Sequence, residues 1–243
     1  MEPPPKPSQK PILPILSSPS HHAFQAPVKK IHTGPDVQSF LTSTAYRDIG
    51  LFVLQLNRAL CPRKHVLGNG REVARTFTLD TVSEAKLPAS VRNLRMLLRR
   101  VEEFMDEAPP DEGPRRFGNV SFRVWYGLLE GRVDGLLGGG FLKIDHDERK
   151  AGKDKIEAKN EEGVGKEAAQ EDDEKEEKVP GLEDELRAYL LGAFGSPQRL
   201  DYGTGHELSF LAFLGCLWKV GYFQDGTPEG EIERNIVLGV FEP

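Results

Sequence analysis

The chain has 243 residues, of which 38% are hydrophobic, and its only cysteines are Cys61 and Cys216. This length allows a buried core in one or two domains, while so few cysteines exclude a disulfide-stapled secreted scaffold. The net charge is −6, and residues 145–178 account for all of it with 14 acidic against 8 basic side chains. The balanced remainder carries no basic stripe and argues against duplex nucleic acid as a partner.

Residues 1–27 are rich in proline and poor in large apolar residues, so we expect a disordered or extended tail. The start lacks the basic and apolar parts of a secretory signal. The longest near-continuous apolar stretch, residues 208–220, is too short to span a bilayer. We therefore expect a soluble intracellular protein, cytoplasmic with the nucleus as a second compartment, and no membrane partner.

Helical periodicity begins after Gly34-Pro35, with Asp36 as the expected N-cap, and continues to Cys61-Pro62. A Gly68-Asn69-Gly70 turn follows, and the residues after it show only weak periodicity. A clear amphipathic helix then opens near residue 90 and ends before two prolines at 109–110. A third helix is predicted from about residue 118 to 137, where three glycines end it.

The charged segment 145–178 is expected to be a disordered insert that divides one helical domain into residues 28–144 and 179–243. Helix returns at residues 182–194, and an apolar, buried helix is predicted to start near His206. A last helical segment covers residues 229–241. No convincing strand pair is present, so the predicted fold class is all-α.

The loop at residues 199–207 is the strongest candidate site. Gly203 and Gly205 immediately precede a helix, where free backbone N–H groups and the positive end of the helix dipole favour phosphate. Arg199 can contact phosphate oxygens in bidentate fashion, and Thr204 offers a hydroxyl. The carboxylates of Asp201 and Glu207 are oxygen ligands that suit Mg²⁺. The alternative is an ordinary glycine-rich connection in which Asp201 or Thr204 is only a helix cap.

Other candidates are weaker. Cys61 with His65 lacks further partners for a nucleophile or a metal site. Trp125 and Tyr126 fit a hydrophobic core better than a ligand-stacking role. No Ser-His-Asp constellation can be assembled from the sequence.

Three segments together resemble the phosphotyrosyl phosphatase activator family, the activators of type 2A protein phosphatase. Residues 29–57 carry the first, from Lys-Lys-Ile to the Leu-Asn helix. Residues 116–125 read RFGNVSFRVW, and residues 193–210 contain AFGS followed by RLDYGTGHELSF. The last of these motifs is highly specific, and the likeness runs from about residue 28 to the end, apart from the insert.

The resemblance implies an all-helical fold with a cleft between core and lid parts. It also implies peptidyl-prolyl cis/trans isomerase activity, binding of ATP and Mg²⁺, and activation of the phosphatase catalytic subunit, with a proline-containing peptide as substrate. By motif position, Arg199, Gly203, Thr204 and Gly205 would contact the nucleotide. The adjoining cleft, with the catalytic residues, would be formed by Asp201, Tyr202, His206 and Glu207. A non-catalytic binding chaperone of the phosphatase remains the alternative.

The family continues beyond a helix like residues 229–241 into a segment that supplies Mg²⁺ ligands and much of the cleft. The chain ends before that segment, so we expect a truncated, fungal-type member with an incomplete fold at its C-terminus. An inactive fragment is a third alternative, because its last helix would then leave Ile232, Ile236 and Val240 exposed without a partner. No metal ligand is assigned within the chain, and the oligomeric state stays open.

Overall fold

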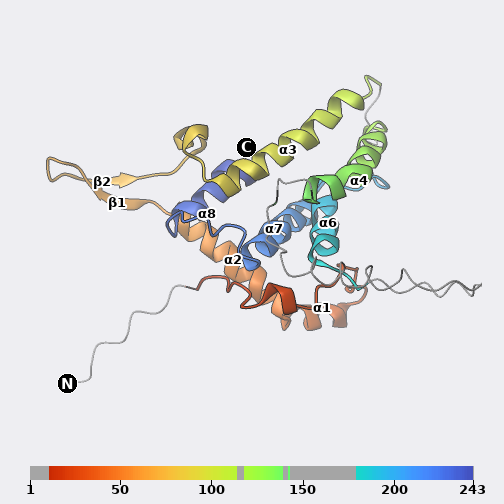
Figure 1. The fold of residues 1–243 in the computed structure, drawn as a ribbon, viewed down its shortest axis with the longest axis horizontal. Helices are drawn as coiled ribbons and strands as arrows, with labels where there is room; N and C mark the ends of the chain where they lie inside the picture. The colour runs from red at the N-terminus through yellow and green to blue at the C-terminus, as the bar shows by residue number, and fades with distance from the viewer. Residues whose placement is uncertain (1–10, 114–117, 139–141, 143–178, 243) are drawn as a thin grey trace, which may run out of the picture.

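The computed structural model describes residues 11–113, 118–138, 142 and 179–242 (Figure 1). The expected disordered insert at 145–178 and residues 1–10 lie outside these ranges. The described part is helical apart from one small hairpin, which confirms the predicted all-α class. Three short 3₁₀ turns occur besides the helices, at Pro19–His21, Leu79–Thr81 and Glu84–Lys86.

The first two helices are α1 (Gly34–Leu41) and α2 (Thr44–Leu60). The expected N-cap Asp36 is wrong by three positions, because Thr33 is the N-cap and Asp36 is the third helical residue. The Asp36 carboxylate accepts hydrogen bonds from the backbone N–H groups of His32 and Thr33, at 3.0 and 2.8 Å. These bonds hold the pKa of Asp36 below its ordinary value. This is a capping box, in which the side chain at the third helical position satisfies donors before the helix.

The weakly periodic stretch after α2 contains a pair of strands, although the sequence predicted none. Strands β1 (Arg63–Val66) and β2 (Glu72–Arg75) form an antiparallel hairpin that extends away from the helices (Figure 1). Its loop is the predicted Gly-Asn-Gly turn, where the Gly70 N–H donates to the Leu67 carbonyl at 2.8 Å. Gly70 has φ +80°, a conformation that glycine adopts without strain. A turn of this kind between two short valine-containing runs is the hairpin signal.

The remaining helices build the body. They are α3 (Ala89–Glu107), α4 (Phe122–Gly138), α6 (Leu182–Gly192), α7 (Thr204–Lys219) and α8 (Glu231–Ile236), with a π-helical turn at Val237–Phe241. Helix α6 packs against both α4 and α7, and α2 packs against α7 and α8. Helix α3 packs against α4 and the π-helical turn. The predicted buried helix is α7, whose Phe213, Leu214 and Leu217 are fully buried.

The C-terminal residues expected to be exposed are instead part of the core. Ile232, Ile236 and Val240 are 3%, 0% and 4% exposed. They are buried because α8 packs on α2 and the π-helical turn packs on α3 (Figure 1). The sequence alone cannot show this, because both partners lie more than a hundred residues earlier.

The proline-rich tail also differs from expectation where the structure describes it. From residue 11 the segment lies on the body, and Leu13 and Phe24 belong to the hydrophobic core. The Leu13 N–H donates to Gln55 Oε1 and its carbonyl accepts from Trp218 Nε1, both at 2.9 Å. Few apolar residues are enough here, because the body supplies a preformed groove with partners for the backbone.

Among the described helices, none combines the length and the apolar character needed to cross a bilayer.

Candidate functional site

The site lies where the loop after α6 turns into α7. Ser196 and Asp201 pair across this loop, with the Ser196 N–H donating to the Asp201 carbonyl at 3.1 Å. The Leu200 N–H donates to the Ser196 carbonyl at 2.8 Å. Leu200 itself has φ +55°, and it is the one non-glycine residue with positive φ in the described ranges. Such a backbone persists only where the surroundings hold it in place.

Two glycines from separate motifs hold this turn. Gly118 has φ +87°, and a Cβ there would lie 2.6 Å from both Leu200 Cβ and the Leu200 carbonyl oxygen. Gly195 has φ +111°, and its Cβ would lie 3.0 Å from the Asp201 carbonyl oxygen. Arg123 adds a hydrogen bond from Nε to the Pro197 carbonyl at 2.9 Å. Residues 118–125 and 193–210, which carry parts of two of the sequence motifs, are therefore one structural unit.

Helix α7 begins without a side-chain cap. Its N-cap is Gly203 in extended conformation, and this residue makes no side-chain cap hydrogen bond. The cap alternative for Asp201 and Thr204 is therefore wrong. A Cβ on Gly203 or Gly205 would meet no atom within 4 Å, so both glycines face open space. The His206 N–H donates to the Gly203 carbonyl at 2.8 Å, whereas the N–H groups of Thr204 and Gly205 lie before the first intrahelical bond, and their contact with an anion stays a prediction.

Arg199 and Asp201 pair with each other at the edge of the turn. Arg199 Nε lies 2.8 Å from Asp201 Oδ2, and both side chains are more than half exposed. An exposed pair of this kind contributes little stability. It nevertheless orients the guanidinium and leaves its two Nη groups for a ligand.

His206 and Tyr202 form a second contact pair. Their rings stack with centroids 5.4 Å apart, and His206 Nδ1 lies 2.7 Å from the Gly192 carbonyl oxygen. Since a carbonyl only accepts, Nδ1 carries the proton of this hydrogen bond. Partial burial, followed by the negative charge of Glu207, raises the pKa of Tyr202 above its ordinary value. The Tyr202 hydroxyl is therefore a stable hydrogen-bond donor at neutral pH.

An apolar hollow of about 670 Å³ adjoins the turn. Tyr202 and Glu207 line it from the turn and the first turn of α7. Most of the other lining side chains are apolar and come from α3, α4, α7, the end of α6 and the C-terminal turn: Leu98, Val101, Met105, Trp125, Ala193, Phe194, Phe210 and Phe241. Glu102 and Glu242 complete the rim. The hollow thus joins a nonpolar surface to four polar side chains, three of which are glutamates.

Trp125 is more than a core residue. Its ring packs against Phe122 and Phe194, as a core position predicts, and it also lines the hollow. Its indole N–H is buried and has no hydrogen-bond partner among the described residues. A buried donor without a partner is uncommon in folded proteins.

The structure thus divides the eight predicted residues by location. Tyr202 and Glu207 line the hollow, Gly203, Thr204 and Gly205 form the exposed helix start, and Arg199, Asp201 and His206 hold the turn in shape. Sequence reasoning missed most of the apolar wall and the supporting Gly118. The wall has no local signal, because its residues are ordinary helix-face residues until the helices are assembled.

The weaker candidates are not brought together into sites. Cys61 is exposed at the end of α2 and His65 is exposed on β1. Burial, followed by the neighbouring Glu185, raises the pKa of the Cys216 thiol to about 12, so this thiol is not a reactive nucleophile. Nowhere in the described ranges do three or more His, Cys, Asp or Glu side chains gather in a way that could hold a metal ion.

Comparison with known proteins extends over most of the chain. A family model described as "Phosphotyrosyl phosphate activator (PTPA) protein" matches residues 27–243. Serine/threonine-protein phosphatase 2A activator 1 of Emericella nidulans is 46% identical over 237 residues, which cover 97% of this chain and 48% of that protein. The protein of the same name from Aspergillus fumigatus is 46% identical over 232 residues, covering 96% and 43%.

Among solved structures, the crystal structure of the PP2A phosphatase activator Ypa1 PTPA1 is similar, with a TM-score of 0.59 and 25% identity. The match covers 93% of this chain and 60% of that one. The chain thus spans about half the length of the curated relatives named above.

Proposed function

Because the chain belongs to the phosphotyrosyl phosphatase activator family, we propose that it activates type 2A protein phosphatase by acting on the catalytic subunit. The observation that carries this proposal is the juxtaposition of an uncapped, exposed helix start with an apolar hollow. The first feature suits a phosphate group and the second suits a peptide. The helix start belongs to residues 193–210, and the hollow combines residues of that motif and Trp125 with side chains of α3 and the C-terminal turn.

ATP with Mg²⁺ is the proposed cofactor. The donor set fits its phosphates, because Gly203 and Gly205 leave the backbone N–H groups of the helix start open and Arg199 keeps its Nη groups free. When bound, the nucleotide would supply a concentrated negative charge that strengthens the grip on the phosphatase. Since Asp201 is engaged by Arg199, Mg²⁺ would be held mainly by phosphate oxygens.

Peptidyl-prolyl isomerisation is the proposed chemistry in the hollow. The barrier to rotation about a peptide bond is ~18–20 kcal/mol and comes from amide resonance, so catalysis needs no nucleophile. An apolar wall that includes Trp125 and Phe210 favours the twisted amide, which has lost its resonance stabilisation. The Tyr202 hydroxyl is placed to donate a hydrogen bond to the peptide, and Glu207 can accept one.

A direct test measures both activities on the same variants. The complete chain is assayed for isomerisation of a proline peptide and for activation of the phosphatase catalytic subunit with ATP and Mg²⁺. Tyr202→Phe should slow isomerisation about tenfold by removing one neutral hydrogen bond to the twisted amide. Gly205→Asp should abolish the ATP dependence, because it adds a negative charge at the helix start. Gly135→Asp adds the same charge on an open face of α4 and is the matched control.

A binding chaperone remains a second candidate function, and the roles of Asp201 and His206 favour it. Asp201 pairs with Arg199 and His206 bonds the Gly192 carbonyl, so neither side chain is left to react with a substrate. The hollow then acts as a binding surface. Full phosphatase activation by Tyr202→Phe with no isomerisation would support the chaperone. Unchanged ATP dependence in Gly205→Asp would refute the proposed nucleotide site.

A further inference from the structure

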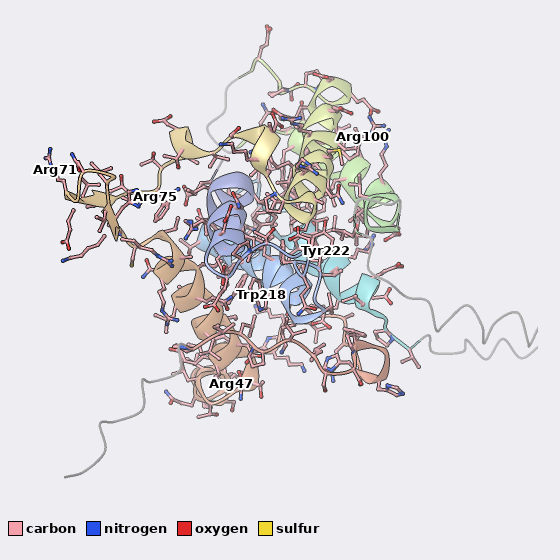
Figure 2. All side chains as sticks on the ribbon, turned by 60° about the vertical axis from the view of Figure 1, so that its left-hand side comes forward. Arg47, Arg71, Arg75, Arg100, Trp218 and Tyr222 are labelled. Carbon is pink, nitrogen blue, oxygen red and sulfur yellow. The ribbon has the colours of Figure 1, made fainter. Side chains whose placement is uncertain are left out.

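The hairpin at residues 63–75, here called the arm, carries a concentration of positive charge. It contains Arg63, Lys64, Arg71 and Arg75 against one carboxylate, Glu72. Figure 2 shows Arg71 at the far end of the arm, away from the packed helices, and Arg75 nearer to its base. Every residue of β1 is exposed, and on β2 only Val73 is partly buried. The whole chain has net charge −6, so this basic surface is local.

The strand register sorts these charges onto two faces. Arg63 pairs with Arg75 and His65 pairs with Val73, so these four side chains lie on one face, together with Arg71 two residues before Val73. Lys64 and Glu72 fall on the other face, where they form an ion pair of 3.0 Å. The first face is therefore cationic without any carboxylate, and it is here called the arginine face.

The arginine face continues onto the body at the base of the arm. Arg75 and Arg234 of α8 both lie over the ring of Phe77, at 5.3 and 4.5 Å from its centroid. Arg63 Nη2 would lie 3.1 Å from a Cβ on Gly230, and Arg234 Nη1 would lie 3.6 Å from the same Cβ, so these two guanidinium groups are neighbours. Burial first, and then the positive charge of Arg63, lowers the pKa of Arg234.

The charges of these arginines are not balanced by ion pairs within the described part of the chain. No ion pair joins Arg63, Arg71, Arg75 or Arg234 to a carboxylate there. Glu231 and Glu233 lie near enough to raise the pKa of Arg234, but Glu233 is 2% exposed and accepts hydrogen bonds from Gly230 and Gln55. Like charges directly opposite each other destabilise a strand pair, as Arg63 and Arg75 do here. A bound anion would remove that repulsion.

We propose that the arginine face binds an acidic protein segment in extended conformation, with carboxylates at alternate positions. Arg71 and Arg75 are four residues apart, which spans about 13 Å along a strand. An extended segment repeats its side-chain direction every second residue, so carboxylates four residues apart match this spacing, and the one between them meets the level of the His65–Val73 pair. Both strands have a free edge in this two-stranded sheet, and their backbone groups can pair with the same segment.

Nucleic acid fits less well. The cationic face is short, and the chain outside residues 145–178 has balanced charges, so a long polyanion would find no extended basic surface beyond it. A peptide of a few residues meets the arginines without approaching the rest of the surface. This interaction is separate from the proposed phosphatase activation and does not depend on it.

The test uses the full chain and a fluorescein-labelled peptide of alternating glutamate and threonine, followed by fluorescence anisotropy. Arg71→Gln and Arg75→Gln should each weaken binding about tenfold, because each removes a guanidinium that pairs with a carboxylate. Lys64→Gln removes the same charge from the opposite face and should change the affinity less than about twofold. The same peptide with glutamine in place of glutamate should not bind.

Three results would overturn the proposal. Equal losses in Lys64→Gln and Arg75→Gln would mean that the arm attracts anions without a defined face. Absence of saturable binding by the glutamate peptide would remove the site altogether. Tighter binding of a labelled single-stranded oligonucleotide than of the glutamate peptide would assign the arm to nucleic acid instead. Helical circular dichroism of each variant checks that the body stays folded.

Discussion

Leu200 shows how much of the candidate site depends on backbone shape at single residues. Its positive φ lies inside the turn in which Ser196 pairs with Asp201, directly before Asp201 and Tyr202. The conformation costs a non-glycine residue about 1–3 kcal/mol, which neighbouring contacts must offset. Gly118 allows the closest of these contacts, because any side chain there would overlap Leu200.

Gly118→Ala should therefore destabilise the protein and disturb the turn. The new Cβ would lie 2.6 Å from two Leu200 atoms and would sit on a backbone with φ +87°. We expect the free energy of unfolding to fall by about 1–3 kcal/mol, as measured by urea denaturation. Gly131→Ala is the matched control, since that glycine lies in α4 with open space around its Cβ. It should raise stability by up to about 1 kcal/mol, and an equal loss in both variants would contradict the role of Gly118.

Asp48 makes a second residue-scale contribution, and its effect depends on pH. Burial alone would raise the pKa of Asp48, but hydrogen bonds from Lys219 and Arg47 outweigh it and hold the pKa below the ordinary value of 3.8. A carboxyl group with a lowered folded-state pKa adds stability above its unfolded pKa. That stability is lost as the pH falls through the folded-state value.

Asp48→Asn should lower the free energy of unfolding by about 2–4 kcal/mol near pH 7, because Lys219 loses its partner in a mostly buried place. The difference from wild type should stay constant between about pH 5 and pH 8 and shrink below about pH 4. Urea denaturation at several pH values measures it. Asp106→Asn replaces an exposed carboxylate on α3 and should show a small difference at every pH. A difference for Asp48→Asn that grows on acidification would contradict the assignment.

At the scale of elements, the segment from residue 11 to residue 16 is the clearest case of tertiary contacts deciding structure. It has no helix or strand of its own, yet Leu13 is 2% exposed and its backbone bonds to α2 and α7. The Leu16 N–H also donates to the Lys219 carbonyl at 2.7 Å. The segment thus fastens the start of the chain across two helices.

Leu13→Ala should cost about 2–4 kcal/mol of unfolding free energy, as for other fully buried leucines, because it leaves a cavity between α2 and α7. Ile12 is the matched control, since its side chain is 36% exposed. Ile12→Ala should cost less than about 1 kcal/mol in the same thermal or urea denaturation. If the two substitutions cost the same, the segment is not packed as described.

At the scale of the whole molecule, one hydrophobic core runs from Leu13 to Val240 and includes both tryptophans. Trp125 lies beside Phe194 after α6, and Trp218 lies near the end of α7 beside Phe52 and Phe223. A continuous core favours cooperative unfolding of all parts that share it. The fluorescence of the two tryptophans therefore follows unfolding at two ends of the same hydrophobic core.

The protein should unfold in a single step whichever end is observed. Trp125→Phe leaves Trp218 as the sole tryptophan, and Trp218→Phe leaves Trp125. Within each variant, tryptophan fluorescence and helical circular dichroism should give the same urea midpoint. The midpoints of the two variants will differ, because Trp218→Phe also removes a hydrogen bond to Leu13. A fluorescence midpoint that differs from the helical one would mean that the two ends unfold separately.

The sequence predicted the helices well where the pattern was local. The apolar face of α3, the buried α7 and the glycine-rich start of α7 all follow from residues close together in the chain. The Gly-Asn-Gly turn was found, but the hairpin around it was missed because its strands are short and almost fully exposed. An exposed strand lacks the apolar alternation by which strands are recognised.

The sequence by itself determined the helical class, the exposed glycine turn and the motifs that identify the family. Only the tertiary structure decided that Gly118 supports Leu200, that Trp125 and Phe210 line one hollow, and that Leu13 and Ile236 are buried. The physical reason is the distance along the chain between the residues that interact. Periodicity and capping act over a few residues, whereas burial and the shape of a hollow depend on helices that meet across a hundred residues or more.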